Sequence, residues 1–208
     1  MRFHHIPAPV QLLFPHFVWH KSRKEKVVYL TFDDGPVPGV TDFVLEELAL
    51  RQMKATFFMV GDNISRYPDL ALRVKYQGHQ IGNHTYNHLN GYQCSEEVYL
   101  GNFSKCQETL TKVLALQPRL FRAPYGRITK NQRLGIAKTH QIVMWDVIPG
   151  DFDPGQDAYV CLAKAKAHTQ NGSIVLFHDQ KKTEKVLVEM LPDFLDFIQQ
   201  KGYETGLL

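Results

Sequence analysis

Short apolar segments alternate with amphipathic helical patterns along most of this chain, and this alternation restricts its possible folds more than any other feature. We expect strands at 27–32, 54–60, 79–83, 120–122, 141–145 and 173–177. We expect helices at 41–50, 68–77, 95–116, 129–139, 157–168 and 183–200, with Thr41 as the cap of the first. Such alternation predicts a parallel sheet covered by helices. The fold class is therefore α/β, and the number of elements suits a small or incomplete β/α barrel.

The 208 residues are enough for one domain with a sizeable core, and we find no internal repeat. Residues 1–26 precede the first strand, and their first twenty positions are rich in proline and aromatic residues. We expect this segment to be an extended arm whose rings pack against the domain. Residues 27–208 then form a single domain.

Composition excludes several classes of protein. The formal charge is only +3, with lysine and arginine scattered, so we expect no nucleic-acid partner. Cys94, Cys106 and Cys161 fit neither a disulfide framework nor a cysteine-rich zinc site, although a Cys94–Cys106 pair stays open. We favour free thiols in a reducing compartment. No signal peptide or apolar stretch of about 18 residues is found, which favours a cytoplasmic protein; the oligomeric state is unknown.

Two adjacent carboxylates, Asp33 and Asp34, follow the first predicted strand, and Gly35 and Pro36 end it. Carboxylates this close repel each other unless a cation or a proton lies between them. A plain Asp-Gly turn is the alternative interpretation.

Other predicted strands also end in polar side chains. In β/α folds the working groups collect at the C-terminal ends of the strands, so these side chains are expected to meet at one rim. They are Asp33, Asp34, His84, His88, Arg122, Tyr125, Asp146, Asp151, His178 and Asp179.

His84 and His88 face the same way if the backbone between them is helical. With one carboxylate from the first strand end they form a two-histidine, one-aspartate set that can chelate a divalent metal. Three protein ligands leave a position open, which is typical of a catalytic zinc site. The alternative is a pair of surface histidines.

These motifs, in this order, resemble those of the polysaccharide deacetylase family, the carbohydrate esterases that share the NodB homology domain (carbohydrate esterase family 4). The matching segments are Thr-Phe-Asp-Asp-Gly-Pro at 31–36, His-Thr-x-x-His at 84–88, Arg-Ala-Pro-Tyr at 122–125, an aspartate motif near 145–152 and Leu-Phe-His at 176–178. The resemblance covers about residues 27–206 and implies a NodB-like fold, a distorted β/α barrel with about seven parallel strands.

The resemblance implies a role for each matching residue. Asp34, His84 and His88 would hold one divalent metal, with zinc favoured and cobalt, nickel or manganese as alternatives. The remaining roles are Asp33 as general base, His178 as acid, Arg122 to orient Asp33, the Tyr125 N–H as oxyanion donor, and Leu176 as pocket lining.

The fourth motif departs from the family pattern, which has Asp-Trp where this chain has Asp151-Phe152. We expect Asp151 to orient Arg122 and His178, with Asp146 or Asp153 as alternatives. Phe152 would replace the tryptophan as a pocket wall, and Trp145 is a further candidate for the substrate pocket.

The resulting prediction is a metal-dependent hydrolase that removes N-acetyl groups from an N-acetylated carbohydrate partner. Hydrolysis of O-acetyl esters or of a non-sugar amide remains open, as does the choice among chitin oligomers, peptidoglycan and other glycans. A non-haem iron oxygenase also uses two histidines and a carboxylate, but its usual barrel is antiparallel. A carbohydrate-binding protein without catalysis would need neither Asp33 nor His178.

Overall fold

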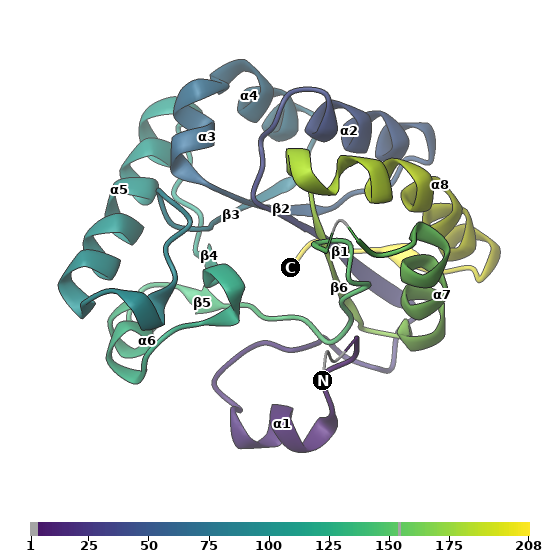
Figure 1. The fold of residues 1–208 in the computed structure, drawn as a ribbon, viewed down its shortest axis with the longest axis horizontal. Helices are drawn as coiled ribbons and strands as arrows, with labels where there is room; N and C mark the ends of the chain where they lie inside the picture. The colour runs from purple at the N-terminus through teal and green to yellow at the C-terminus, as the bar shows by residue number, and fades with distance from the viewer. Residues whose placement is uncertain (1–3, 154) are drawn as a thin grey trace.

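The computed structural model describes residues 4–153 and 155–208. Seven strands form one curled sheet with all pairings parallel, in the order β5–β4–β3–β2–β1–β6, and β7 pairs with the start of β1 (Figure 1). The strands are β1 Val27–Asp33, β2 Thr56–Met59, β3 Gln80–Asn83, β4 Leu120–Phe121, β5 Gln141–Ile142, β6 Ile174–His178 and β7 Glu204–Thr205. The predicted parallel, barrel-like α/β fold is confirmed.

The helices surround the outside of this curled sheet, while α1 lies apart from the others beside the N-terminus (Figure 1). The α-helices are α1 Ala8–Leu13, α2 Val40–Leu50, α3 Gly61–Arg66, α4 Pro68–Tyr76, α5 Glu96–Leu114, α6 Lys130–Ala137, α7 Ala158–His168 and α8 Glu184–Gln200. Three single 3₁₀ turns complete the described elements: η1 Gly91–Gln93, η2 Pro124–Gly126 and η3 Lys181–Thr183.

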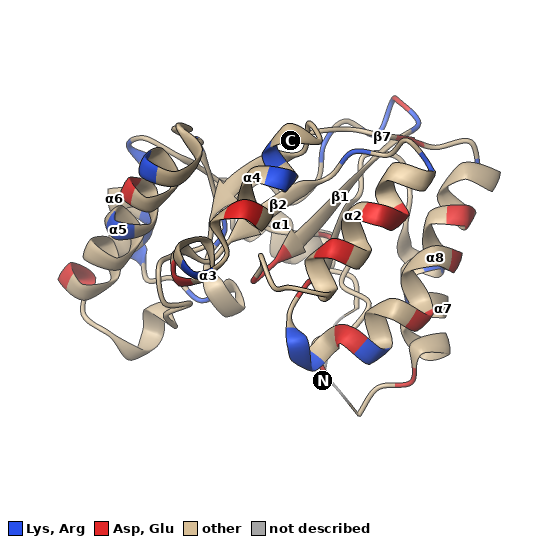
Figure 2. Ribbon diagram, turned by 90° about the horizontal axis from the view of Figure 1, so that it is seen from above, with Lys and Arg blue, Asp and Glu red and all other residues tan. Residues whose placement is uncertain are grey.

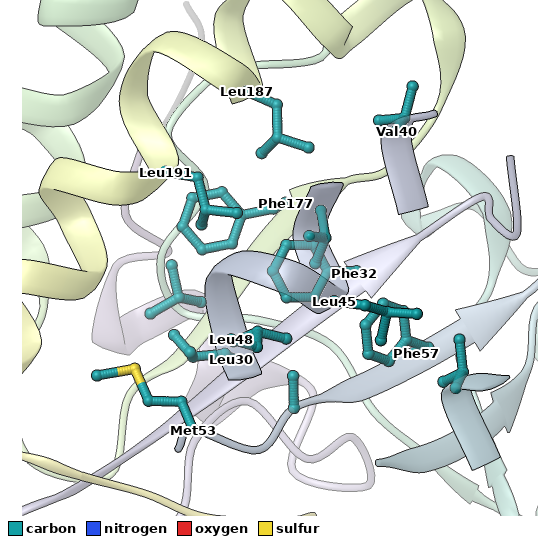
Figure 3. Packing of buried hydrophobic residues seen from close by; sticks show 14 of the residues in the cluster. Leu30, Phe32, Val40, Leu45, Leu48, Met53, Phe57, Phe177, Leu187 and Leu191 are labelled. Carbon is teal, nitrogen blue, oxygen red and sulfur yellow. The ribbon is translucent and has the colours of Figure 1, made fainter. Parts of the chain in front are cut away.

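The main hydrophobic core lies between the strands β1, β2 and β6 and the helices α2 and α8 (Figure 3). Phe32 on β1 stacks between Phe57 on β2, at 5.2 Å, and Phe177 on β6, at 5.5 Å. Leu187 and Leu191 of α8 cover these rings from outside and are fully buried. Because β1 is buried on both sides, its register with β2 and β6 is fixed, and so is the position of its last residue, Asp33.

The sequence predicted that the N-terminal segment is extended. This prediction is wrong in part, because helix α1 interrupts the segment. Pro9 lies in the first turn of this short helix, where its fixed backbone angle is tolerated. The segment also pairs with the sheet: Val18 bridges Val143, and His20 bridges Ser173. The division into an arm and a domain at residue 26 stays a prediction.

The gap between β5 and β6 is covered by the segment that follows β5. Val143 bridges Val18, and Val147 bridges Val175 of β6. The sequence predicted a strand as far as Trp145, but β5 ends at Ile142. The chain there crosses from β5 towards β6 instead of continuing in a regular ladder.

Two predicted helix ends also differ. Helix α2 begins at Val40, one residue before the predicted cap, and the Asp42 carboxylate accepts the N–H of Gly39 at 2.7 Å. The hydroxyl of Thr41 instead accepts the N–H of Val37 at 2.8 Å. Helix α5 begins after Ser95 as expected but ends at Leu114, two residues early.

All three cysteines are free thiols, as expected. Acidic and basic side chains are interspersed over the helices, in keeping with the small net charge (Figure 2). None of the helices in the described ranges is both long and apolar enough to cross a bilayer.

Candidate active site

The site is built at the C-terminal end of β1. Asp33 and Asp34 are 3% and 6% exposed, so both carboxyl groups are buried at the rim of the sheet. Parallel pairing places Asp33 directly beside His178, the last residue of β6. Asp34 has a φ of 86°, so the backbone turns sharply there. Regular strand register thus brings together an aspartate and a histidine that are far apart in the sequence.

Three predicted metal ligands, Asp34, His84 and His88, come together. Their ligand atoms all lie within 4.8 Å of one another. Asp34 Oδ1 is 2.9 Å from His88 Nε2 and 3.5 Å from His84 Nε2, and it is buried without a hydrogen-bond partner in the described chain. A buried oxygen with no donor is costly, and a cation between these atoms would satisfy it. The donor set therefore fits a divalent metal.

The orientation of the imidazoles supports this fit. His84 Nδ1 lies 2.8 Å from the carbonyl oxygen of Arg122, which can only accept, so Nδ1 carries the proton. That leaves Nε2, which faces Asp34, with a free lone pair, the usual arrangement for a metal-ligating histidine. The segment between the histidines is not helical, contrary to the condition set above, because Thr85 and His88 have φ values of 62° and 55°.

Burial alone would raise the pKa of Asp34, but the imidazoles of His84 and His88, with His178 near by, outweigh it. They hold the pKa of this carboxyl well below its usual range. Asp34 is therefore ionised at neutral pH and can act as an anionic ligand.

Arg122 is fully buried and holds Asp33. Its Nη1 donates to Asp33 Oδ1 at 2.7 Å and to Thr31 Oγ1 at 2.8 Å. Its other nitrogens donate to the backbone carbonyls of Val143 and Met144 at 3.3 and 2.9 Å. A buried guanidinium needs such partners, and each one fixes its plane. The expectation that Asp151 also orients Arg122 is wrong: the carbonyls after β5 do this.

Asp151 holds His178. Its carboxylate lies 3.2 and 3.3 Å from His178 Nδ1 and accepts the backbone N–H of the same residue at 2.7 Å. Burial would lower the pKa of His178, but Asp151 outweighs burial and raises it to about 9. Asp146, one predicted alternative, instead contacts Arg23 and Ser173. The interpretation of Asp151 as the partner of His178 agrees with this geometry.

These groups open into a cavity of about 560 Å³. The sequence-predicted residues that line it are Asp33, Asp34, His84, His88, Tyr125, Trp145, Phe152, Leu176 and His178. Phe152 packs edge-on against His178 at 5.8 Å, and Tyr125 packs against His88 at 4.6 Å. Arg122 and Asp151 act from behind the cavity wall.

Several lining residues were missed: Asn90, Gln93, Ala123, Arg127, Ile148, Gln180 and Lys182. Gln180 donates from Nε2 to Asp34 Oδ2. It follows β6 by two residues, so the strand-end argument that found His178 could have found it. Residues 90, 93 and 127 lie in turns, where no periodic pattern marks them.

Asp179 received no role from the sequence, yet it supports the turn after β1. Its Oδ1 accepts the N–H of Gly35 at 3.0 Å, and its Oδ2 accepts the Thr41 hydroxyl at 2.6 Å. A Cβ on Gly35 would lie 2.1 Å from this carboxylate, so only glycine fits there. Burial raises the pKa of Asp179 to about 8, although both hydrogen bonds oppose the shift.

Comparisons with known proteins agree with this site. Two relatives from Bacillus cereus are named peptidoglycan-N-acetylglucosamine deacetylases: one is 36% identical over 73% of this chain and 55% of its own length, the other 34% identical over 90% and 89%. This chain thus spans about half of the first relative. A chitooligosaccharide deacetylase from Bradyrhizobium is 37% identical over 73% of this chain and 70% of its own length.

Among solved structures, the Bc1960 peptidoglycan N-acetylglucosamine deacetylase superposes with a TM-score of 0.90 at 28% identity, covering 98% of this chain and 95% of that one. A pseudoenzyme of carbohydrate esterase family 4 from Bacillus anthracis shares the fold at 23% identity, with a TM-score of 0.81 over 91% of this chain and 66% of that one. The fold therefore occurs with and without activity. The sequence profile described as polysaccharide deacetylase matches residues 20–145, more than half of the chain, and together with these relatives it shows that the chain belongs to the polysaccharide deacetylase family.

Proposed function

We propose that this protein is a metal-dependent hydrolase that removes N-acetyl groups from N-acetylated amino sugars. The observation that carries the proposal is the approach of His84 and His88 to a buried, unpartnered oxygen of Asp34. The Asp33–Arg122 pair lies beside them. A site for binding a sugar alone would need none of these charges. The relatives named as deacetylases of peptidoglycan and chitooligosaccharides support the sugar substrate.

Asp34, His84 and His88 would hold the cation, and zinc is the first candidate for this set of ligands. When bound, a divalent ion there would lower the pKa of a water molecule and polarise the acetamide carbonyl. Cobalt, nickel and manganese suit the same donors.

Asp33 is placed to take the proton from the attacking water. Its Oδ2 lies 3.7 Å from His84 Nε2, so this oxygen points towards the proposed cation site. Its other oxygen accepts a hydrogen bond from Arg122, which fixes the orientation of the carboxylate. General-base catalysis of this kind contributes about 10²- to 10⁴-fold in rate.

His178 is placed to protonate the leaving amine. Asp151 holds its ring through Nδ1, so Nε2 is free to give its proton to the substrate. Leu176, Trp145 and Phe152 supply apolar and aromatic walls, against which the acetyl group and the sugar ring would pack. The Tyr125 N–H would be a donor to the developing oxyanion.

The test compares wild type with Asp33→Asn in metal content and in acetate release from N-acetylglucosamine oligomers. Asp33→Asn should keep the metal but lose about 10²- to 10⁴-fold in kcat, because the base is removed while the ligands stay. Asp193→Asn, a change at an exposed position on α8, is the matched control and should retain full activity.

A fully active Asp33→Asn variant would contradict the assignment of the base. Failure of the wild type to bind any metal would exclude the mechanism and favour a carbohydrate-binding protein. Bound metal with no acetate released from any oligomer would move the search to O-acetyl esters and non-sugar amides.

A further inference from the structure

A second cavity, of about 700 Å³, adjoins the candidate active site. Residues adjacent in the sequence line the two cavities: Tyr92 lines the second and Gln93 the first, while Gly126 of the second lies between Tyr125 and Arg127 of the first. The N-terminal segment supplies the opposite wall. The second cavity is lined by Leu13, Phe14, His16, Phe17, Tyr92, Gly126, Ile128, Thr129, Lys130 and Arg133.

The walls of this cavity offer aromatic rings to a ligand. Phe17 packs against Phe14 at 6.3 Å and against His16 at 4.8 Å, which forms an aromatic wall on the N-terminal side. Tyr92 is 65% exposed on the other side. Exposed rings that border a cavity are typical of ligand surfaces, since one face is apolar and the edge remains wet.

The charges around the two cavities are unbalanced. Lys130 and Arg133 line the second cavity, which has no carboxylate among its lining residues. Arg127 and Lys182 line the first cavity, and both are exposed. In the described ranges, the side chains of these four residues have no ion-pair or hydrogen-bond partner.

Most other arginines of the described chain do have an ion-pair partner. Each of five other arginines is paired with a carboxylate: Arg23, Arg51, Arg66, Arg73 and Arg122. Of the three described arginines that are not, Arg127 and Arg133 border these cavities, and Arg119 lies in a separate one. Two of the three unpaired arginines therefore lie where a substrate would extend from the active site.

We propose that the second cavity is a substrate subsite that binds a carboxylate carried by the glycan, two or more sugar units from the acetyl group that is removed. The proposal rests on the proposed deacetylase function and adds the substrate class: acidic N-acetylated glycans are preferred over neutral ones. Arg133 and Lys130 bind the carboxylate, and Tyr92 packs on the intervening sugar. Arg127 joins the two cavities along the path of the chain.

The test measures kcat/KM on three oligosaccharides of equal length. One is a neutral N-acetylglucosamine oligomer, one carries carboxylic acids directly on alternate sugars, and one carries short acidic peptides on those acids. Wild type should prefer the acidic oligomers, and the preference should fall as salt rises because exposed charge pairs are screened. The two acidic oligomers distinguish a carboxylate on the sugar from one on the peptide.

The variant that tests the cavity is Lys130→Gln with Arg133→Gln. It should lose about threefold to tenfold in kcat/KM on the preferred acidic oligomer and less than about twofold on the neutral one. Arg127→Gln alone should show a smaller loss of the same kind. Arg119→Gln, which removes an unpaired arginine from another face, is the matched control and should change neither value.

Equal losses on neutral and acidic oligomers would overturn the subsite, as would a wild type with no preference. If the wild type released no acetate at all, the deacetylase function would fail, but calorimetric binding of the same oligomers would still decide the subsite. Tighter binding of the acidic oligomers that the double variant loses would support it, and equal binding would overturn it.

Discussion

Asp179 is a buried carboxyl whose protonation should be visible in the stability of the protein. Burial raises its pKa to about 8, so the folded state holds a proton that the unfolded state, with an ordinary aspartate pKa near 3.8, releases. The favourable contribution is complete below the unfolded value and is lost as pH rises towards about 8. We expect the free energy of unfolding of wild type to fall, relative to Asp179→Asn, between about pH 4 and pH 8.

The asparagine variant is informative because it imitates the neutral acid. Its amide oxygen can accept the N–H of Gly35, and its amide nitrogen can donate to Thr41. Urea unfolding of both proteins at several pH values gives the difference. A difference that is constant over this range would show that Asp179 has an ordinary pKa.

The titration of His178 should determine the pH at which kcat/KM falls on the alkaline side of its pH profile. Its pKa of about 9 means that the ring is protonated at neutral pH and loses its proton as pH rises through that value. If the ring is the acid, kcat/KM falls there. Asp151→Asn removes the charge that raises the pKa, so the alkaline limb should move to lower pH.

A pH profile of kcat/KM for wild type and Asp151→Asn measures this shift, and Asp193→Asn serves again as a control for a lost surface charge. If the alkaline fall in kcat/KM occurs at the same pH in Asp151→Asn, a group other than His178 is responsible for it.

Helix α8 makes the largest contribution of any helix to the core, and Phe194 lies at its centre. The ring is fully buried and packs edge-on against Phe177 at 5.3 Å and face-on against Phe197 at 6.0 Å. Phe194→Ala should lower the free energy of unfolding by about 3–5 kcal/mol, through lost burial and the cavity left behind. Val188→Ala, on the exposed side of the same helix, should cost less than about 1 kcal/mol in a urea titration.

A small loss for Phe194→Ala would mean that the core closes around the missing ring. Because Phe194 of α8 packs against Phe177 of β6, the partner strand of β1, a shift of this helix should also reduce activity.

The elements that the sequence predicted well are those with a regular pattern. The strands from 27 and 173 were found because their residues are apolar and continuous, and register then placed Asp33 beside His178. The errors lie where side chains and turns override the pattern. Helix α2 begins before the predicted cap, because the Asp42 carboxylate accepts the N–H of Gly39. Helix α1 forms in a proline-rich segment that was predicted to be extended. Left-handed backbone at Thr85 and His88 gives a loop where a helical segment was considered.

At the scale of the whole molecule, a bound metal should stabilise the fold, because its proposed ligands come from two separate strand ends that meet only in the folded chain. At a free metal concentration of about 100 times Kd, binding adds about 2.7 kcal/mol, which corresponds to roughly 5–10 °C in Tm for a chain of this size. Zinc should raise the Tm of wild type by this amount and a chelator should reverse it.

His88→Ala should lose the response to zinc, whereas His20→Ala, which changes an exposed histidine away from the site, should keep it. A response that is equal in both variants would place the metal elsewhere.

The barrel as a whole was predictable, but its closure was not. Alternating patterns indicate parallel strands and their number, and they do not indicate how the last strands meet. Here the gap between β5 and β6 is covered by irregular backbone at 143–147, which pairs with the N-terminal segment through Val18. The same irregular segment supplies the carbonyl oxygens that hold Arg122, so the support of this side chain was not visible in any motif.

The position of β1 between β2 and β6 has a consequence for how the protein is made. One neighbour, β2, follows it closely, but the other, β6, comes late: Thr31 and Val175, which touch across β1 and β6, are 144 positions apart. A nascent chain that has not yet reached Ile174 therefore carries β1 with one edge unpaired, a state prone to association with other chains. It also lacks His178, so the proposed catalytic set can be assembled only after this residue has left the ribosome.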